Sequence, residues 1–161
     1  MVTLEELHEI LSQVKDPEVP VLNILDLGIL RSLTCENNHW TIVITPTYSG
    51  CPAMQTIEAD IRTTLSQNNI QNFTIETVLS PAWTTDWISE EGKRKLEEYG
   101  IAPPVDEVDK SVLFSKPPVV PCPLCKSQNT RMVSQFGSTA CKAHYQCLAC
   151  QEPFDYFKCL R

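Results

Sequence analysis

Six of the eight cysteines fall in the C-terminal quarter of the chain, and four of these six form two Cys-x-x-Cys pairs. The pairs are Cys122 with Cys125 and Cys147 with Cys150, and 21 residues separate one pair from the other. Two intervening residues let both sulfurs of a pair reach one ion, and two such pairs on facing turns complete a tetrahedron. The spacing therefore predicts a structural four-cysteine zinc site.

Other states of these cysteines stay open at this point. The same four thiolates could hold an iron–sulfur cluster, and two disulfides or free thiols form a third alternative that a reducing cytosol disfavours. Cys141, His144 and Cys159 lie outside the two pairs. Four thiolates already saturate a zinc ion, so His144 is expected to be an ordinary side chain. Cys141 and Cys159 stay unassigned.

Cys51 is the strongest candidate for a reactive cysteine among the first hundred residues. It follows Ser49-Gly50 in a loop and precedes Pro52, a residue that is well tolerated in the first turn of a helix. A sulfur at a helix N-terminus is favoured as thiolate, which is a soft metal ligand or a nucleophile. We therefore expect Cys51 to be an exposed, reactive thiol, against the alternative of a small hydrophobe packed at a helix start.

Two acidic residues could assist Cys51. Asp16 and Glu18 flank Pro17 in a loop and could act as metal or proton partners if the fold brings the loops together, although loop acids are commonly solvated. Cys35 lies in a predicted strand, so we expect it to be buried in the core and to react with an alkylating agent more slowly than Cys51.

Common catalytic motifs are absent. The sequence contains no G-x-x-x-x-G-K-[ST], G-x-G-x-x-G, H-E-x-x-H or G-x-S-x-G pattern, and it contains three histidines. An autonomous enzyme is therefore disfavoured.

The charge is distributed unevenly along the 161 residues, whose formal net charge is −7. Residues 1–100 carry 15 acidic against 6 basic side chains, and residues 119–161 carry 2 against 5. Four thiolates around Zn²⁺ would cancel most of the positive charge of the second segment, so nucleic-acid binding is disfavoured. No segment is apolar enough for a membrane span, and the N-terminus does not resemble a secretory signal, so a cytoplasmic protein is expected.

Hydrophobic periodicity predicts an αββαβα order of elements. The expected elements are an amphipathic helix over residues 3–14 capped by Thr3, a β-hairpin over 29–35 and 40–45, a helix from Pro52 to Gln67, a strand over 73–79, and a short helix from its Ser89 N-cap to Gly100.

The predicted fold class is α+β, with a compact two-layer αββαβα domain over residues 1–102 and a small zinc-ribbon-like β module over 119–161. Proline-rich residues 103–118 are predicted to be a linker. The small module cannot bury enough apolar surface alone and needs its metal for stability. We expect its core to be aromatic, formed by Phe136, Tyr145, Phe154, Tyr156 and Phe157.

Several motifs resemble known families. The first domain resembles the iron–sulfur assembly family that includes bacterial SufT, in Asp16-Pro17-Glu18-Val19-Pro20-Val21, Asp26-Leu27-Gly28, Thr45-Pro46-Thr47 and Ser49-Gly50-Cys51-Pro52. Other segments resemble more closely the PaaD family of the phenylacetate-degradation pathway. These are Pro81-Ala82-Trp83-Thr84-Thr85-Asp86-Trp87, Tyr99-Gly100-Ile101, the run from Phe136 to Ala143 and the run from Glu152 to Cys159.

The resemblance implies a role beside the multicomponent phenylacetyl-CoA epoxygenase. It implies an accessory factor that matures or delivers the iron–sulfur or diiron centres of that complex, with its iron–sulfur reductase among the partners. It also implies that Cys51 is the function-bearing cysteine, that Asp16 and Glu18 lie in its signature loop, and that iron or a cluster is carried transiently. The alternatives are an integral non-catalytic subunit of the oxygenase and a zinc-ribbon nucleic-acid adaptor. The resemblance does not fix the oligomeric state, for which a homodimer is one alternative.

Overall fold

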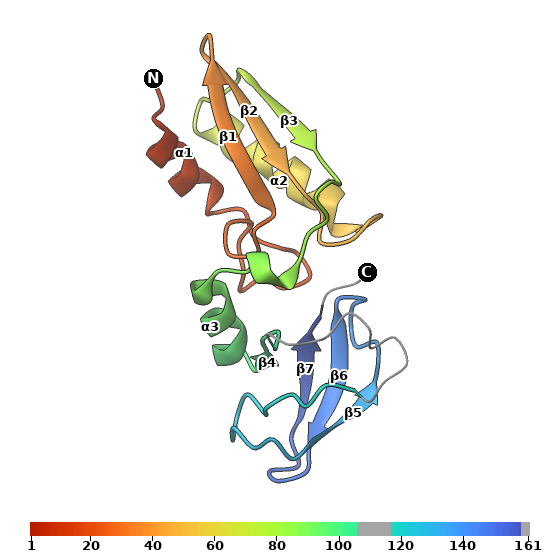
Figure 1. Ribbon diagram of the computed structural model, residues 1–161. Coiled ribbons are helices and arrows are strands. Elements are labelled where there is room, and N and C mark those ends of the chain that lie inside the picture. Colours follow the sequence, from red (N-terminus) through yellow and green to blue (C-terminus); the bar gives the residue numbers. More distant parts are fainter. Residues whose placement is uncertain (106–116, 159–161) are drawn as a thin grey trace. The chain divides into compact units, whose positions relative to one another are not determined.

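The computed structural model describes residues 1–105 and 117–158, which form two compact units (Figure 1). The first unit comprises residues 1–92, and the second begins at Lys93. Each unit contains one β-sheet of its own.

The first unit is a two-layer α+β domain. Its elements are α1 (Leu4–Leu11), β1 (Leu30–Glu36), β2 (His39–Ile44), α2 (Ala53–Gln67), β3 (Phe73–Thr77) and the 3-10 helix η1 (Thr85–Trp87). The sheet has the order β1-β2-β3, in which β1 and β2 are antiparallel and β2 and β3 are parallel. Helix α2 makes the crossover between the parallel strands and lies against the sheet (Figure 1). The α+β class and the element order predicted from the sequence are confirmed.

Local sequence explains where these elements begin and turn. Thr3 caps α1 in a capping box, because its side chain accepts from the Glu6 N–H while the Glu6 carboxylate accepts from the Thr3 N–H. Asn37 and Asn38 form the two-residue hairpin turn with φ of 50° and 62°, as a turn matching the strand twist requires. Pro52 is the N-cap residue of α2 and directly follows Cys51.

The core of the first unit lies between the sheet and its helices. Strand β2 is central and alternates buried with half-buried residues, whereas the edge strand β1 is mostly exposed. The buried apolar side chains of the three contributing elements are Leu7 and Leu11 of α1, Trp40, Ile42 and Ile44 of β2, and Ala53, Ile57, Ile61 and Leu65 of α2. The sheet thus fixes the positions of the loops at its two ends.

The segment after β3 is held to the loop before β1. The Trp83 indole N–H donates to the Leu27 carbonyl at 2.7 Å, and the Arg31 guanidinium lies 3.5 Å from the Trp87 ring centroid. Gly28 has a φ of +70° and packs so closely on Trp87 that a Cβ would lie 2.5 Å from its carbonyl oxygen. Glycine is therefore required at position 28.

The second unit is a four-stranded ribbon with the order β4-β7-β6-β5. Its strands are β4 (Ile101–Ala102), β5 (Thr130–Ser134), β6 (Lys142–Cys147) and β7 (Pro153–Phe157). Tyr145 stacks on Phe154 with the ring centroids 5.7 Å apart, and Tyr156 packs edge-on against Tyr145. These residues and Phe157 are buried as expected. The prediction for Phe136 is wrong, because that ring is 56% exposed in the turn after β5 and lies beside the Lys158 ammonium.

The second unit includes residues before the predicted linker. Helix α3 (Glu90–Glu98) begins on the Ser89 cap, and its Glu97 pairs with Lys126 of the second unit. Strand β4 pairs in parallel with β7, so residues 101 and 102 are part of the second sheet. Proline content could not indicate this two-residue pairing. Residues 106–116 of the predicted linker lie outside the described residues, and the division into 1–102, 103–118 and 119–161 stays a prediction.

Candidate functional site

Four sulfur atoms gather at one end of the second unit. The Sγ atoms of Cys122, Cys125, Cys147 and Cys150 all lie within 4.8 Å of one another. Cys122 and Cys150 have their sulfurs 3.8 Å apart, and Cys125 and Cys147 have theirs 3.5 Å apart. Zn–S bonds of about 2.3 Å in a tetrahedron place sulfurs ~3.8 Å apart, whereas a disulfide requires ~2.05 Å. The donor set and its spacing therefore fit zinc, and they exclude disulfides between these partners.

The two turns that carry these sulfurs are built alike. In each turn the residue after the second cysteine has a positive φ, 65° at Lys126 and 68° at Gln151. This conformation lets each turn fold back, so that the Lys126 N–H donates to the Cys122 carbonyl and the Cys147 N–H donates to the Glu152 carbonyl. The Cys150 N–H donates to the Cys147 sulfur, and this bond is the largest of several that together lower the pKa of the Cys147 thiol to about 7. The backbone thus favours the thiolate form of Cys147, one of the four candidate ligands.

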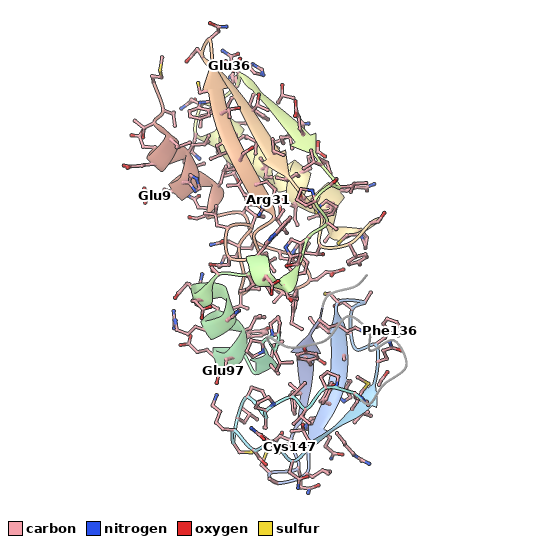
Figure 2. All side chains as sticks on the ribbon, viewed as in Figure 1. Glu9, Arg31, Glu36, Glu97, Phe136 and Cys147 are labelled. Carbon is pink, nitrogen blue, oxygen red and sulfur yellow. The ribbon has the colours of Figure 1, made fainter. Side chains whose placement is uncertain are left out.

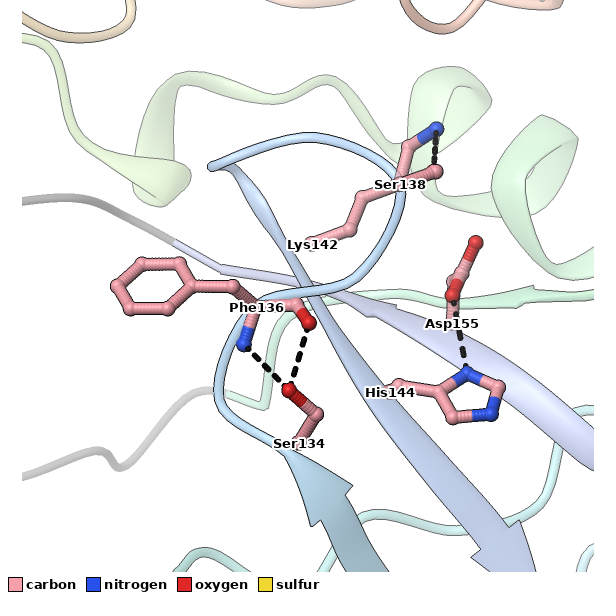
Figure 3. Close-up of polar contacts among 6 residues, drawn as sticks. All are labelled: Ser134, Phe136, Ser138, Lys142, His144 and Asp155. Atoms are coloured by element: carbon pink, nitrogen blue, oxygen red, sulfur yellow. Dashed lines mark hydrogen bonds and ion pairs between the residues drawn. The ribbon is translucent and has the colours of Figure 1, made fainter.

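The remaining ribbon residues of interest lie elsewhere. Cys141 is buried, with its sulfur 3.1 Å from the Thr139 hydroxyl, and it does not belong to the group of four sulfurs. The His144 Nδ1 faces the Asp155 carboxylate at 3.5 Å, on neighbouring strands (Figure 3). The unassigned Cys159 lies outside the described residues.

Cys51 lies where a loop enters α2, one residue before the Pro52 N-cap, as the sequence predicts. Its exposure differs from the expectation, because the residue is only 8% exposed and not an open loop thiol. The loop folds over it: the Cys51 N–H donates to the Tyr48 carbonyl at 3.2 Å, and the Thr47 hydroxyl lies 4.0 Å from the Cys51 sulfur. Beside it, Ser49, Gly50 and Pro52 are exposed. The Cys51 side chain is therefore nearly buried, although residues on both sides of it in the chain are exposed.

Two threonines of this loop were missed as candidate site residues. Thr47 is buried and its hydroxyl is the polar neighbour of the Cys51 sulfur. Thr45 is 1% exposed. Among the described residues, its hydroxyl oxygen is a buried side-chain polar atom that has no hydrogen-bond partner. A buried unpaired hydroxyl is costly and points to a functional constraint. The signal available in the sequence was the presence of two threonines, Thr45 and Thr47, shortly before Gly50-Cys51.

Asp16 and Glu18 hold a second loop of the first unit. The Asp16 carboxylate is buried and accepts the backbone N–H groups of Glu18 at 2.7 Å and Val19 at 2.9 Å. Asp16 therefore shapes its own loop, and Glu18 is half-buried beside it. In the part of the chain that the structure describes, the ligand atoms of Cys51, Asp16 and Glu18 do not come close enough together to form a group that could hold one metal ion. Their joint role stays a prediction.

Cys35 differs from its prediction. It is exposed on β1, because β1 is an edge strand that presents most of its residues to solvent (Figure 1). The expected order of thiol reactivity therefore reverses.

Treating the native protein with iodoacetamide should alkylate Cys35 before Cys51, since the first thiol is exposed and the second is covered by its loop. Mass-spectrometric mapping of labelled peptides over time measures both rates, with the unfolded protein as the control in which they converge. Faster labelling of Cys51 in the native protein would contradict its burial under the loop.

The fold and the site define a class: an α+β domain with a cysteine at a helix entrance, followed by a four-cysteine zinc ribbon. Comparison with known proteins agrees with both parts. Residues 4–70 match the iron–sulfur cluster assembly protein family, and residues 106–158 match the PaaD zinc beta ribbon domain. A protein of Escherichia coli (strain K12), provisionally named as one of the subunits of a 1,2-phenylacetyl-CoA epoxidase, is 47% identical over 157 residues, covering 98% of this chain and 93% of that protein. The chain belongs to the PaaD family.

Other relatives match the first domain. An Fe-S protein maturation auxiliary factor of Porphyromonas gingivalis is 32% identical over 96 residues, covering 58% of this chain and 90% of that protein. A crystal structure of a DUF59 domain of unknown function from Bacillus anthracis has a TM-score of 0.53 and 32% identity, covering 57% of this chain and 89% of the other. Within the described residues, no helix has the length and apolar character needed to cross a membrane.

Proposed function

We propose that this chain is an accessory, non-catalytic factor that matures or delivers the iron–sulfur or diiron centres of a phenylacetyl-CoA epoxygenase in the cytoplasm. The observation that carries the proposal is the placement of Cys51 at the entrance of α2, within a domain that matches iron–sulfur cluster assembly proteins. The full-length relative named for an epoxidase supports the choice of client. We expect the iron–sulfur reductase of that complex to be among the partners.

The chemistry at Cys51 would be ligand exchange. The cargo is iron or an iron–sulfur cluster. The Cys51 thiol loses its proton to solvent, its sulfur binds the iron as a donor ligand leaves, and a client ligand later displaces Cys51 without change of oxidation state. The Thr47 hydroxyl can donate a hydrogen bond to the sulfur. A loop of exposed residues must open for the exchange, and such loops open at low free-energy cost.

The carboxylates and the ribbon would have supporting roles. Asp16 would hold its loop in shape through two backbone N–H groups, leaving Glu18 as the carboxylate that could ligate cargo or accept a proton. The zinc ion is structural, because four thiolates complete its coordination shell and leave no open position for a reactant. The ribbon therefore serves as a metal-stabilised module for contacts with the client.

A second candidate is an integral non-catalytic subunit of the oxygenase complex. The specific observation that favours it is the provisional name of the full-length relative, which describes that protein as part of an epoxidase. The two candidates differ in what the other components contain when this chain is missing: the maturation factor predicts components that lack iron, and the structural subunit predicts components that are loaded but inactive.

The test is to purify the epoxygenase components from cells with and without this protein and to measure their iron and activity. The maturation proposal expects iron-deficient components that stay inactive when the purified protein is added afterwards without iron. Fully metallated components that regain activity on simple addition of the protein would show the subunit role instead. Fully metallated and active components without it would contradict both.

A further inference from the structure

A pocket of about 630 Å³ opens in the first unit at the end of the sheet where β2 begins. Its walls come from one face of α1, from the hairpin turn with Asn38, and from residues 68–72 between α2 and β3. Trp40 and Ile70 line it and are nearly buried, and the Trp40 N–H is fixed to the Asn72 carbonyl at 2.9 Å. The pocket therefore has a nearly buried apolar floor, and its volume is typical of ligand sites.

The charged groups of the lining leave one carboxylate in excess. Two carboxylates, Glu6 and Glu9, line the pocket together with Met1, whose N-terminal ammonium acts on Glu6, and no lysine, arginine or histidine side chain does. Six side-chain amides also line the pocket, those of Gln13, Asn38, Asn68, Asn69, Gln71 and Asn72. Amides both donate and accept hydrogen bonds, as a peptide backbone does. The lining therefore suits a cationic ligand that also presents peptide groups.

The carboxylates of α1 differ in availability. Glu6 already accepts from the Thr3 N–H in the capping box. Among the described residues the Glu9 carboxylate, on the exposed side of α1 (Figure 2), has no hydrogen-bond or ion-pair partner. Residues 1–100 carry a net charge of −9, which adds a long-range attraction for cations. Glu9 is thus placed to bind a cation next to an apolar surface.

We propose that this pocket binds a short basic peptide segment of a partner protein. An arginine or lysine of the segment pairs with Glu9, an apolar neighbour packs on Trp40 and Ile70, and the side-chain amides pair with the peptide backbone. Charge complementarity selects this occupant over an acidic or a purely apolar one.

The position of the pocket separates it from Cys51. Strand β2 starts at the pocket and ends at the loop that leads to Cys51, and α2 returns from Cys51 to the pocket. Helix α2 has 15 residues, so it spans about 22 Å at 1.5 Å per residue. A partner held at the pocket therefore leaves the Cys51 end of the domain accessible. The proposal does not depend on the proposed function of Cys51.

The test titrates the full-length, zinc-loaded protein with acetyl-Gly-Arg-Leu-Gly-amide, and in parallel with the same peptide containing citrulline in place of arginine. The arginine peptide should bind in a saturable way, shift the amide resonances of residues 68–72, and weaken as salt is added. The citrulline peptide should bind the unmodified protein about tenfold more weakly than the arginine peptide does, since a charge-assisted hydrogen bond is lost. For the same reason, the Glu9→Gln variant should bind the arginine peptide about tenfold more weakly than the unmodified protein does.

Glu76→Gln is the matched control, because Glu76 is exposed on β3 and does not line the pocket. Its affinity for the arginine peptide should equal that of the unmodified protein. The proposal is overturned if the arginine peptide does not bind at millimolar concentration, if the citrulline peptide binds equally well, or if Glu76→Gln weakens binding as much as Glu9→Gln. Glu9 is exposed, so its substitution should leave the fold intact.

Discussion

Replacing Cys125 by serine is expected to release the zinc ion and to unfold the ribbon over residues 119–161, while the first unit stays folded. Cys125 is exposed, so its substitution removes a metal ligand without opening a cavity in the aromatic core. Structural zinc contributes on the order of 10 kcal/mol to the folding of such small modules. Metal analysis of the purified protein and amide resonances of the two units measure the two effects.

Leu124→Ser provides the matched control, because Leu124 lies in the same turn, is 59% exposed and supplies no ligand. This variant should keep one zinc ion per chain and a folded ribbon. One zinc ion still bound in Cys125→Ser would contradict the assignment of Cys125 as a required ligand. Substitutions of Cys122, Cys147 and Cys150 should behave like Cys125→Ser, with added packing losses at the buried Cys122 and Cys147.

The four cysteines of the metal site could be predicted from the sequence because their spacing is local. A Cys-x-x-Cys turn places two sulfurs by itself, and only the meeting of two turns depends on the fold. The positive φ at Lys126 and Gln151, which closes both turns, could not be anticipated from residue types that seldom adopt it. The helix start at Cys51 was equally local, since Pro52 marks it.

Burial was harder to predict because it depends on contacts distant in sequence. Cys35 lies in a strand, where a cysteine is commonly buried, but its strand is at the edge of the sheet and its side chain is exposed. Cys51 lies in a loop with the composition of an exposed turn, but Thr47 and its neighbours fold over it. Hydrophobic periodicity assigns a residue to a helix or strand and to one face of it. It does not indicate whether that strand lies at the edge or in the centre of its sheet, and so it does not determine whether the side chain is buried.

Replacing Cys51 by alanine should separate function from stability. Because Cys51 is buried and not a surface residue, we expect the free energy of unfolding to fall by about 1 kcal/mol, with the fold unchanged. The client components should nevertheless be as poor in iron as those from cells that lack the protein, since the transferring ligand is gone. Urea denaturation measures the first effect, and the iron content of the purified client measures the second.

Cys35→Ala is the matched control for the loss of a thiol from the same unit, and it should support full metallation of the client because Cys35 lies on the exposed edge strand. Thr47→Val tests the neighbour of the sulfur: it removes the hydroxyl while keeping the shape of the side chain, so client metallation should slow while Cys51 stays in place. Full client metallation with Cys51→Ala would mean that Cys51 only packs the start of α2, and the transferring ligand would then have to be sought at Cys141 or Cys159.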